Sequence, residues 1–103
     1  MRTAVTHRAE VVERLKAERN RIEGLGVRRL ELFGSFARDE ATAASDVDLL
    51  VEFEPGCKTF RRFMDTVFLL EEVLGREVEL VTPEGLSPYL KDEIVGSAVD
   101  VGP

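Results

Sequence analysis

The chain contains little of several residue types on which many protein functions depend. It has one cysteine, Cys57, so an internal disulfide is excluded and a reducing, cytoplasmic setting is expected. No purely apolar run exceeds four residues, Val67–Leu70, which is far too short to span a membrane. The first residues lack the apolar centre of a signal peptide, because charges interrupt them every few positions.

Basic residues are also in deficit, with 14 Lys and Arg against 20 Asp and Glu and a net charge of -6. This balance argues against general binding to nucleic-acid backbones, although a nucleotide held through metal ions remains compatible with it. The length of 103 residues predicts a single domain over 1–103 with one hydrophobic core.

Hydrophobic periodicity predicts an α+β fold in which a small mixed sheet has helices packed on one side. Gly24 and Gly26 are expected to end the first helix, and Gly75 the second. Ser87 is expected to cap the third, with Pro88 at its first position. The expected helices are 6–23, 59–74 and about 87–95, and the expected strands are 27–33, 46–54 and 77–82.

Asp46 and Asp48 are the first candidates for chemistry. Alternate residues of a strand point to the same side, so both carboxylates can approach one divalent cation at the start of the predicted strand. Such a pair suits the two closely spaced Mg²⁺ or Mn²⁺ ions of nucleotidyl transfer. An isolated Asp-X-Asp pattern is common, however, and by itself favours a solvated strand face.

Gly34 and Ser35 lie where the preceding strand ends and a short helical turn begins. A glycine there lets backbone N–H groups approach a phosphate, and the serine hydroxyl can donate to a phosphate oxygen. Arg38 follows one helical turn later and can reach the same anion. Taken alone, these residues would be an ordinary turn with Ser35 as the helix cap and a surface arginine.

The two motifs together resemble a known signature. Gly34-Ser35, ten intervening residues and Asp46-Val47-Asp48 are similar to the GS-x10-DxD pattern of the DNA polymerase β-like nucleotidyltransferase superfamily. The fuller text, GSFARDEA, SDVDLLVEF and GREVELVTPEGL, resembles the minimal nucleotidyltransferase (MNT) family over about residues 26–99.

This resemblance implies roles for individual residues. Gly34 and Ser35, with Arg38 nearby, would hold the triphosphate of ATP, and Asp46 and Asp48 would bind two Mg²⁺ ions, for which Mn²⁺ can substitute. A third carboxylate on a later strand would complete the site. The resemblance also implies a hetero-oligomer with a HEPN-domain toxin, in which the chain is the antitoxin and adenylylates its partner.

The third carboxylate is where this chain departs from the family pattern, which usually has Asp at the position of Glu79. Glu79 is one methylene longer and shares its strand face with Glu77, so both carboxylates are candidates for a metal-proximal or proton-accepting role. The alternative is that Glu77 and Glu79 are ordinary polar residues on an exposed strand face, with no role in catalysis.

These observations leave three candidate functions, which experiments can distinguish. The first is Mg²⁺-dependent transfer of a nucleoside monophosphate, AMP from ATP, to a hydroxyl on a partner protein. The second is an antitoxin that neutralises its partner by binding alone, with a site weakened at Glu79. The third is a small-molecule nucleotidyltransferase, which usually needs a further domain for its acceptor.

The remaining residues of note receive plainer interpretations. His7, a lone histidine on the first helix, is expected to be solvent-exposed and without a role. Cys57 is expected to be a spectator thiol, because the chain offers no second histidine to activate it. Arg61 and Arg62 are expected on a solvated helix face. The phenylalanines of the second helix are expected to serve the core and one side of a protein interface: Phe60, Phe63 and Phe68.

Overall fold

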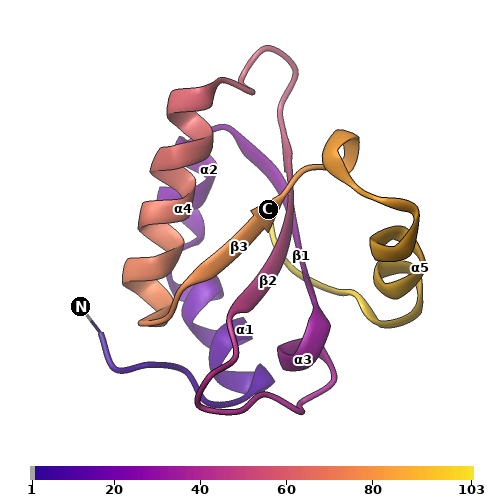
Figure 1. Cartoon of the computed structure of the whole chain (residues 1–103). Coiled ribbons are helices and arrows are strands. Elements are labelled where there is room, and N and C mark those ends of the chain that lie inside the picture. The colour runs from indigo at the N-terminus through magenta and orange to yellow at the C-terminus, as the bar shows by residue number, and fades with distance from the viewer. Residues whose placement is uncertain (1) are drawn as a thin grey trace.

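A four-stranded mixed sheet forms the centre of the protein, shown in Figure 1 as a computed structural model that describes residues 2–103, apart from the side chains of residues 93 and 95. The strand order is β3-β2-β1-β4; β1 pairs antiparallel with β2 and β4, and β2 pairs parallel with β3. The strands are β1 (Val27–Phe33), β2 (Val47–Phe53), β3 (Val78–Val81) and β4 (Val99–Gly102). The predicted α+β class and mixed sheet are confirmed, and β4 is an addition that the sequence did not suggest.

The helices follow the apolar stripes of the sequence, with one difference at the first of them. They are α1 (Arg8–Ala17), α2 (Arg19–Gly24), α3 (Gly34–Ala37), α4 (Phe60–Leu74), the 3-10 turn η1 (Pro83–Gly85) and α5 (Pro88–Ser97). The single helix predicted over 6–23 is two helices, because Glu18 leaves helical geometry at φ -105°, ψ 16°. The break falls just before Arg19, where the second helix begins.

Local capping explains where α4 and α5 begin and where α4 ends. The Thr59 side chain accepts a hydrogen bond from the Arg62 N–H, and the Ser87 side chain accepts one from the Leu90 N–H. Gly75 ends α4 in the left-handed conformation at φ 66°, which glycine adopts without the steric cost that a side chain brings.

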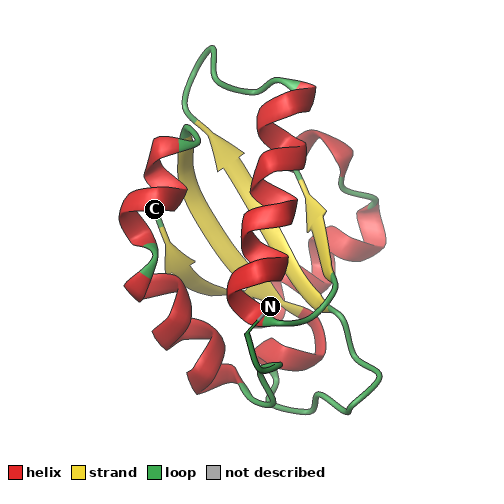
Figure 2. Cartoon of the chain, turned by 90° about the vertical axis from the view of Figure 1, so that its left-hand side faces the viewer, coloured by secondary structure: helices red, strands yellow, loops and turns green. Residues whose placement is uncertain are grey.

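Helices α1, α2 and α4 lie on one face of the sheet, as predicted, and bury the main core there, whereas the predicted helix α5 differs from the expectation because it packs on the opposite face. Figures 1 and 2 show α1, α2 and α4 on this face and α5 on the opposite one. Under α5, Phe33, Leu50 and Ile94 form a second, smaller buried cluster. On the opposite face, α5 and this cluster therefore cover only part of β1 and β2. The cluster does not extend to the start of β2.

The segment before α1 is attached to the body of the protein. Val5 is fully buried, and its N–H donates to the Leu74 carbonyl at 3.0 Å. Arg2 donates to Glu18 at 2.6 Å, and this hydrogen bond lowers the pKa of the Glu18 carboxyl below its usual value. Within residues 2–103, we find no helix with the length and apolar character needed to cross a lipid bilayer.

Candidate active site

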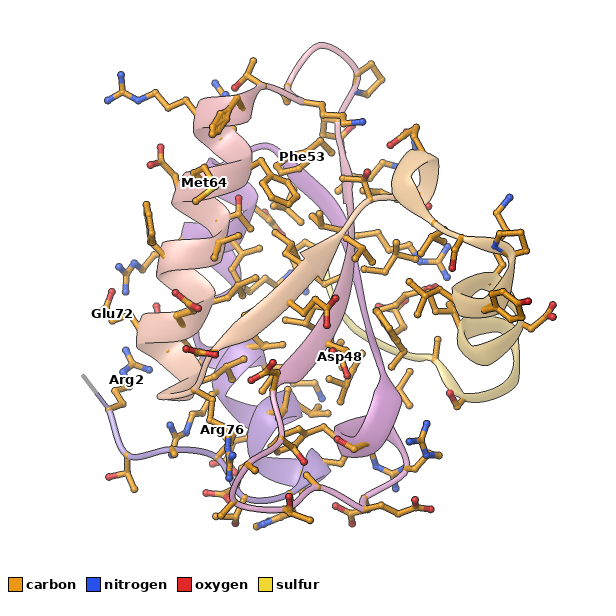
Figure 3. All side chains as sticks on the ribbon, in the orientation of Figure 1. Arg2, Asp48, Phe53, Met64, Glu72 and Arg76 are labelled. Atoms are coloured by element: carbon orange, nitrogen blue, oxygen red, sulfur yellow. The ribbon has the colours of Figure 1, made fainter. Side chains whose placement is uncertain are left out.

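The two aspartates stand at the beginning of β2 on the face opposite the main core. Val47, Leu49 and Val51 are fully buried in that core, so strand alternation directs Asp48 to the other side of the sheet. Asp48 is half-buried there, and Asp46, immediately before the strand, is exposed. In Figure 3, Asp48 projects from the lower part of β2, on the side where α3 and α5 lie.

The parallel strand β3 brings a second pair of carboxylates beside the first. Its register pairs Asp48 with Glu79, and the Val47 N–H donates to the Glu77 carbonyl at 3.0 Å. Paired residues on neighbouring strands are about 4.8 Å apart and point to the same face. Glu79 is therefore the neighbour of Asp48 on this face. Glu77 lies two residues before Glu79, next to Asp46.

The end of β1 closes the site from the other side. Phe33 pairs with Asp48 across the antiparallel ladder, and Gly34 follows at once with φ 72°. A Cβ on Gly34 would overlap Oδ2 of Asp48 and lie 3.1 Å from its Cγ. Gly34 is buried against this carboxylate, so the glycine is required both by its backbone conformation and by the position of Asp48.

Ser35 and Arg38 lie on and just after the short turn α3 that Gly34 begins. Ser35 is half-buried, and its carbonyl accepts from the Glu40 N–H at 2.8 Å. Arg38 is exposed and forms an ion pair with Glu40 at 3.5 Å. The turn places both residues next to Gly34, so the predicted phosphate-binding residues and the aspartates share one end of the sheet.

The donor set fits a hard divalent cation that is also bound by phosphate. Asp46, Asp48, Glu77 and Glu79 supply only carboxylate oxygens, which Mg²⁺ and Mn²⁺ prefer. Among the side chains that the structure describes, no three carboxylate, imidazole or thiol groups lie close enough together to hold a metal ion. Mg²⁺ commonly takes one or two protein carboxylates and completes its shell with substrate phosphates and water, which suits this open arrangement.

The other residues singled out from the sequence lie elsewhere. His7 precedes α1 and is 3.0 Å from Glu10, and Cys57 is a free thiol in the loop after β2. Arg61 and Arg62 are exposed, as predicted. Phe63 packs against the main core, whereas Phe60 and Phe68 are 72% and 59% exposed.

Arg76 is the residue near this site that the sequence did not reveal. Its side chain reaches the loop that leads into Asp46, and its guanidinium carbon lies 5.2 Å from the centre of the Phe36 ring. The only local signal was its place directly after Gly75, which says nothing about the carbonyl groups that it contacts.

Comparison with known proteins agrees with this geometry. The model of the nucleotidyltransferase domain family matches residues 10–101, which includes both motifs and all four carboxylates. The chain belongs to this family. Within it, the chain is a minimal nucleotidyltransferase, as the resemblance predicted.

Two archaeal proteins illustrate the similarity of this minimal nucleotidyltransferase to named relatives. A Methanocaldococcus jannaschii protein, provisionally named a protein adenylyltransferase, is 47% identical over 74% of this chain and 81% of its own length. The protein adenylyltransferase MntA of Thermococcus cleftensis is 37% identical over 77% of this chain and 79% of its own length.

Solved structures share the fold. One, described provisionally as a minimal nucleotidyltransferase, is 37% identical and covers 85% of this chain and 93% of its own, with a TM-score of 0.68. An MNT antitoxin complex with a tri-AMPylated HEPN toxin from Shewanella oneidensis gives a TM-score of 0.55 at 20% identity, covering 85% of this chain and 72% of the other. At that identity the second likeness shows the fold alone.

Proposed function

We propose that this minimal nucleotidyltransferase moves AMP from ATP to a hydroxyl on a partner protein, and that the partner is a HEPN-type toxin for which this chain is the antitoxin. The observation that carries the proposal is the convergence of Gly34, Asp48 and Glu79 from three neighbouring strand ends. The names of the archaeal relatives, protein adenylyltransferases, support the choice of AMP and of a protein acceptor. The complex of an MNT antitoxin with an AMPylated HEPN toxin supports the choice of partner.

In this proposal, the carboxylates of the site bind the metal ions, and the residues of the Gly34 turn bind the phosphates. Asp46 and Asp48 would hold two Mg²⁺ ions together with Glu79, and Mn²⁺ would substitute for Mg²⁺. Bound Mg²⁺ supplies positive charge that offsets the charge of the triphosphate and of the departing pyrophosphate. Gly34 leaves room for the Asp48 carboxylate, while the Ser35 hydroxyl and the Arg38 guanidinium would contact phosphate oxygens.

The transfer itself requires one proton acceptor from the chain. The acceptor hydroxyl oxygen bonds to the α-phosphorus, and the bond from that phosphorus to the pyrophosphate oxygen breaks. Pyrophosphate leaves with the bonding electron pair, and the hydroxyl proton passes to the Glu79 carboxylate. Glu79 has this role in the proposal because it is exposed and adjoins Asp48 in the strand register.

The function is tested by incubating the chain with Mg²⁺-ATP and a HEPN-type protein encoded beside it. We expect the intact mass of the HEPN-type protein to rise by whole adenylyl groups, with one pyrophosphate released for each. Omission of Mg²⁺ should prevent both changes. A stable complex that silences the toxin with no change of mass would contradict the transfer and support neutralisation by binding alone.

That binding-only alternative is favoured by a specific observation, the Glu at position 79, and variants of this residue decide it. If Glu79 accepts the proton, Glu79→Gln should lower turnover by about 100-fold. Glu79→Asp should also lower turnover, since withdrawing the carboxylate by about 1 Å can cost on the order of 100-fold. Pyrophosphate release measures both variants.

Glu77→Gln is the matched control, because Glu77 is also exposed and lies two residues before Glu79, directly before β3, where its carbonyl accepts from the Val47 N–H. We expect this variant to keep most of the turnover. Wild-type turnover in Glu79→Gln beside an inactive Glu77→Gln would move the proton acceptor to Glu77. Higher turnover in Glu79→Asp than in the wild type would indicate a site that has drifted from catalysis.

A further inference from the structure

Arg76 joins four segments that are distant in the sequence. Its Nε donates to the Val5 carbonyl at 2.6 Å, and its guanidinium lies over the Phe36 ring of α3. Its Nη1 points at three carbonyl oxygens of one loop, those of Thr42, Ala43 and Ser45, at 3.2, 3.1 and 3.0 Å. Figure 3 shows Arg76 at the lower end of the molecule, beside this loop.

The loop, residues 41–45, has few other attachments to the protein. Thr42, Ala43 and Ala44 are exposed, and Ala41 is the loop's only side chain that packs against the core. Its internal hydrogen bonds all involve Thr42: the Ser45 N–H donates to the Thr42 carbonyl, the Thr42 N–H donates to Ser45 Oγ, and the Ala44 N–H donates to Thr42 Oγ1. Charge-assisted hydrogen bonds from Arg76 are therefore the main tie between this loop and the body of the protein.

The loop ends at Ser45, directly before Asp46. The position of Asp46 therefore depends on the loop, and that of Asp48 does not. The β2–β3 ladder begins at Val47, so Asp48 is held between Phe33 of β1 and Glu79 of β3. Asp46 precedes the ladder, and its backbone is fixed by Val47 on one side and by the loop on the other.

We infer that Arg76 is a positioning residue that holds Asp46 in place for a divalent cation and triphosphate, acting through the carbonyl groups of Thr42, Ala43 and Ser45. The inference rests on the proposed function for the identity of the ligand. A lysine cannot replace this arginine, because one ammonium group lacks the planar fork that donates to Val5 and to the loop in different directions.

Arg14 provides a control with a purely structural role. It too is a half-buried arginine, and it donates to the carbonyls of Thr3 and, at 3.1 Å, Val73, so it ties the N-terminal segment to α4. Among the described residues, Arg14 contacts Thr3, Val73 and Glu10, and none of these lies in the loop at 41–45. Removal of either arginine loosens the N-terminal segment, and only removal of Arg76 frees the loop.

The test compares Arg76→Ala, Arg76→Lys and Arg14→Ala with the wild type in two measurements that need no turnover. Calorimetry with Mn²⁺ and AMP-PNP should show a loss of affinity of about 10-fold or more in Arg76→Ala, the size typical of groups that orient metal ligands. Hydrogen exchange of the amides in 41–46 should become faster in the same variant. Arg76→Lys should show both changes to a smaller degree, and it replaces Arg76→Ala if that variant does not fold.

Arg14→Ala should lose thermal stability but keep the wild-type Mn²⁺ affinity and the wild-type exchange of 41–46. Wild-type affinity in a folded Arg76 variant would overturn the inference and leave the proposed function intact. A wild-type chain that binds no Mn²⁺ with AMP-PNP would overturn the proposed function, together with the role of Arg76 toward the metal.

Discussion

Gly34→Ala is expected to lower nucleotidyl transfer by about 100-fold or more. An alanine Cβ at this position would overlap Oδ2 of Asp48, so either the carboxylate or the turn around Gly34 must move. A displacement of about 1 Å in a catalytic arrangement can cost on the order of 100-fold in rate. The positive φ of 72° adds a loss of about 1–2 kcal/mol in the free energy of unfolding.

Gly56→Ala separates the two causes. Gly56 has a similar φ of 82°, but a Cβ there would meet no heavy atom within 4 Å. It lies in the turn after β2, at the end of that strand opposite to Asp48. Gly56→Ala should lose the same 1–2 kcal/mol of stability, seen in chemical denaturation, while keeping its turnover. Equal turnover in the two variants would show that the close approach of Gly34 to Asp48 has no part in the reaction.

The central elements could be predicted because short-range patterns specify them. The alternation of Val47, Leu49 and Val51 identifies β2 and the face that carries Asp48. Thr59 and Gly75 mark the beginning and end of α4 with side-chain and backbone chemistry that is visible in the sequence.

The elements that were missed depend on contacts between distant segments. Strand β4 has four residues and exists through its pairing with β1; the alternation of Val99 and Val101 is too short to predict a strand. Val5 lies in a short, mostly polar segment, yet it is fully buried. The break at Glu18 interrupts an apolar stripe that continues on both sides of it.

In the candidate site, too, some features follow from short-range patterns and others from contacts between distant segments. The spacing of Gly34, Ser35, Asp46 and Asp48 is local enough to be recognised, and the structure brings these residues to one end of the sheet. Which glutamate adjoins Asp48 depends on the register of a parallel pair, and a shift of one residue would move every side chain of β3 to the other face. The register observed places Glu79 there.

The charge of Asp48 is the property on which the metal site depends most directly. Asp48→Asn keeps the shape of the side chain and removes its negative charge, so it tests that charge with little change in packing. If the carboxylate holds a divalent cation, the affinity for Mn²⁺ with ATP should fall by about 10- to 100-fold. Turnover should fall by about 100-fold or more, which corresponds to a loss of about 3 kcal/mol of transition-state stabilisation.

Glu52→Gln removes the same charge from the same face of the same strand and is the matched control. Leu50 lies between the two positions and is buried under α5, so Glu52 is separated from Asp48 by an apolar contact. Calorimetry on both folded variants should show wild-type Mn²⁺ affinity for Glu52→Gln only. Equal losses would mean that the cation responds to the overall negative charge of the face. A folded Asp48→Asn that binds Mn²⁺ and ATP as tightly as the wild type would remove Asp48 from the metal site, because no neutral amide can replace a carboxylate whose charge the cation requires.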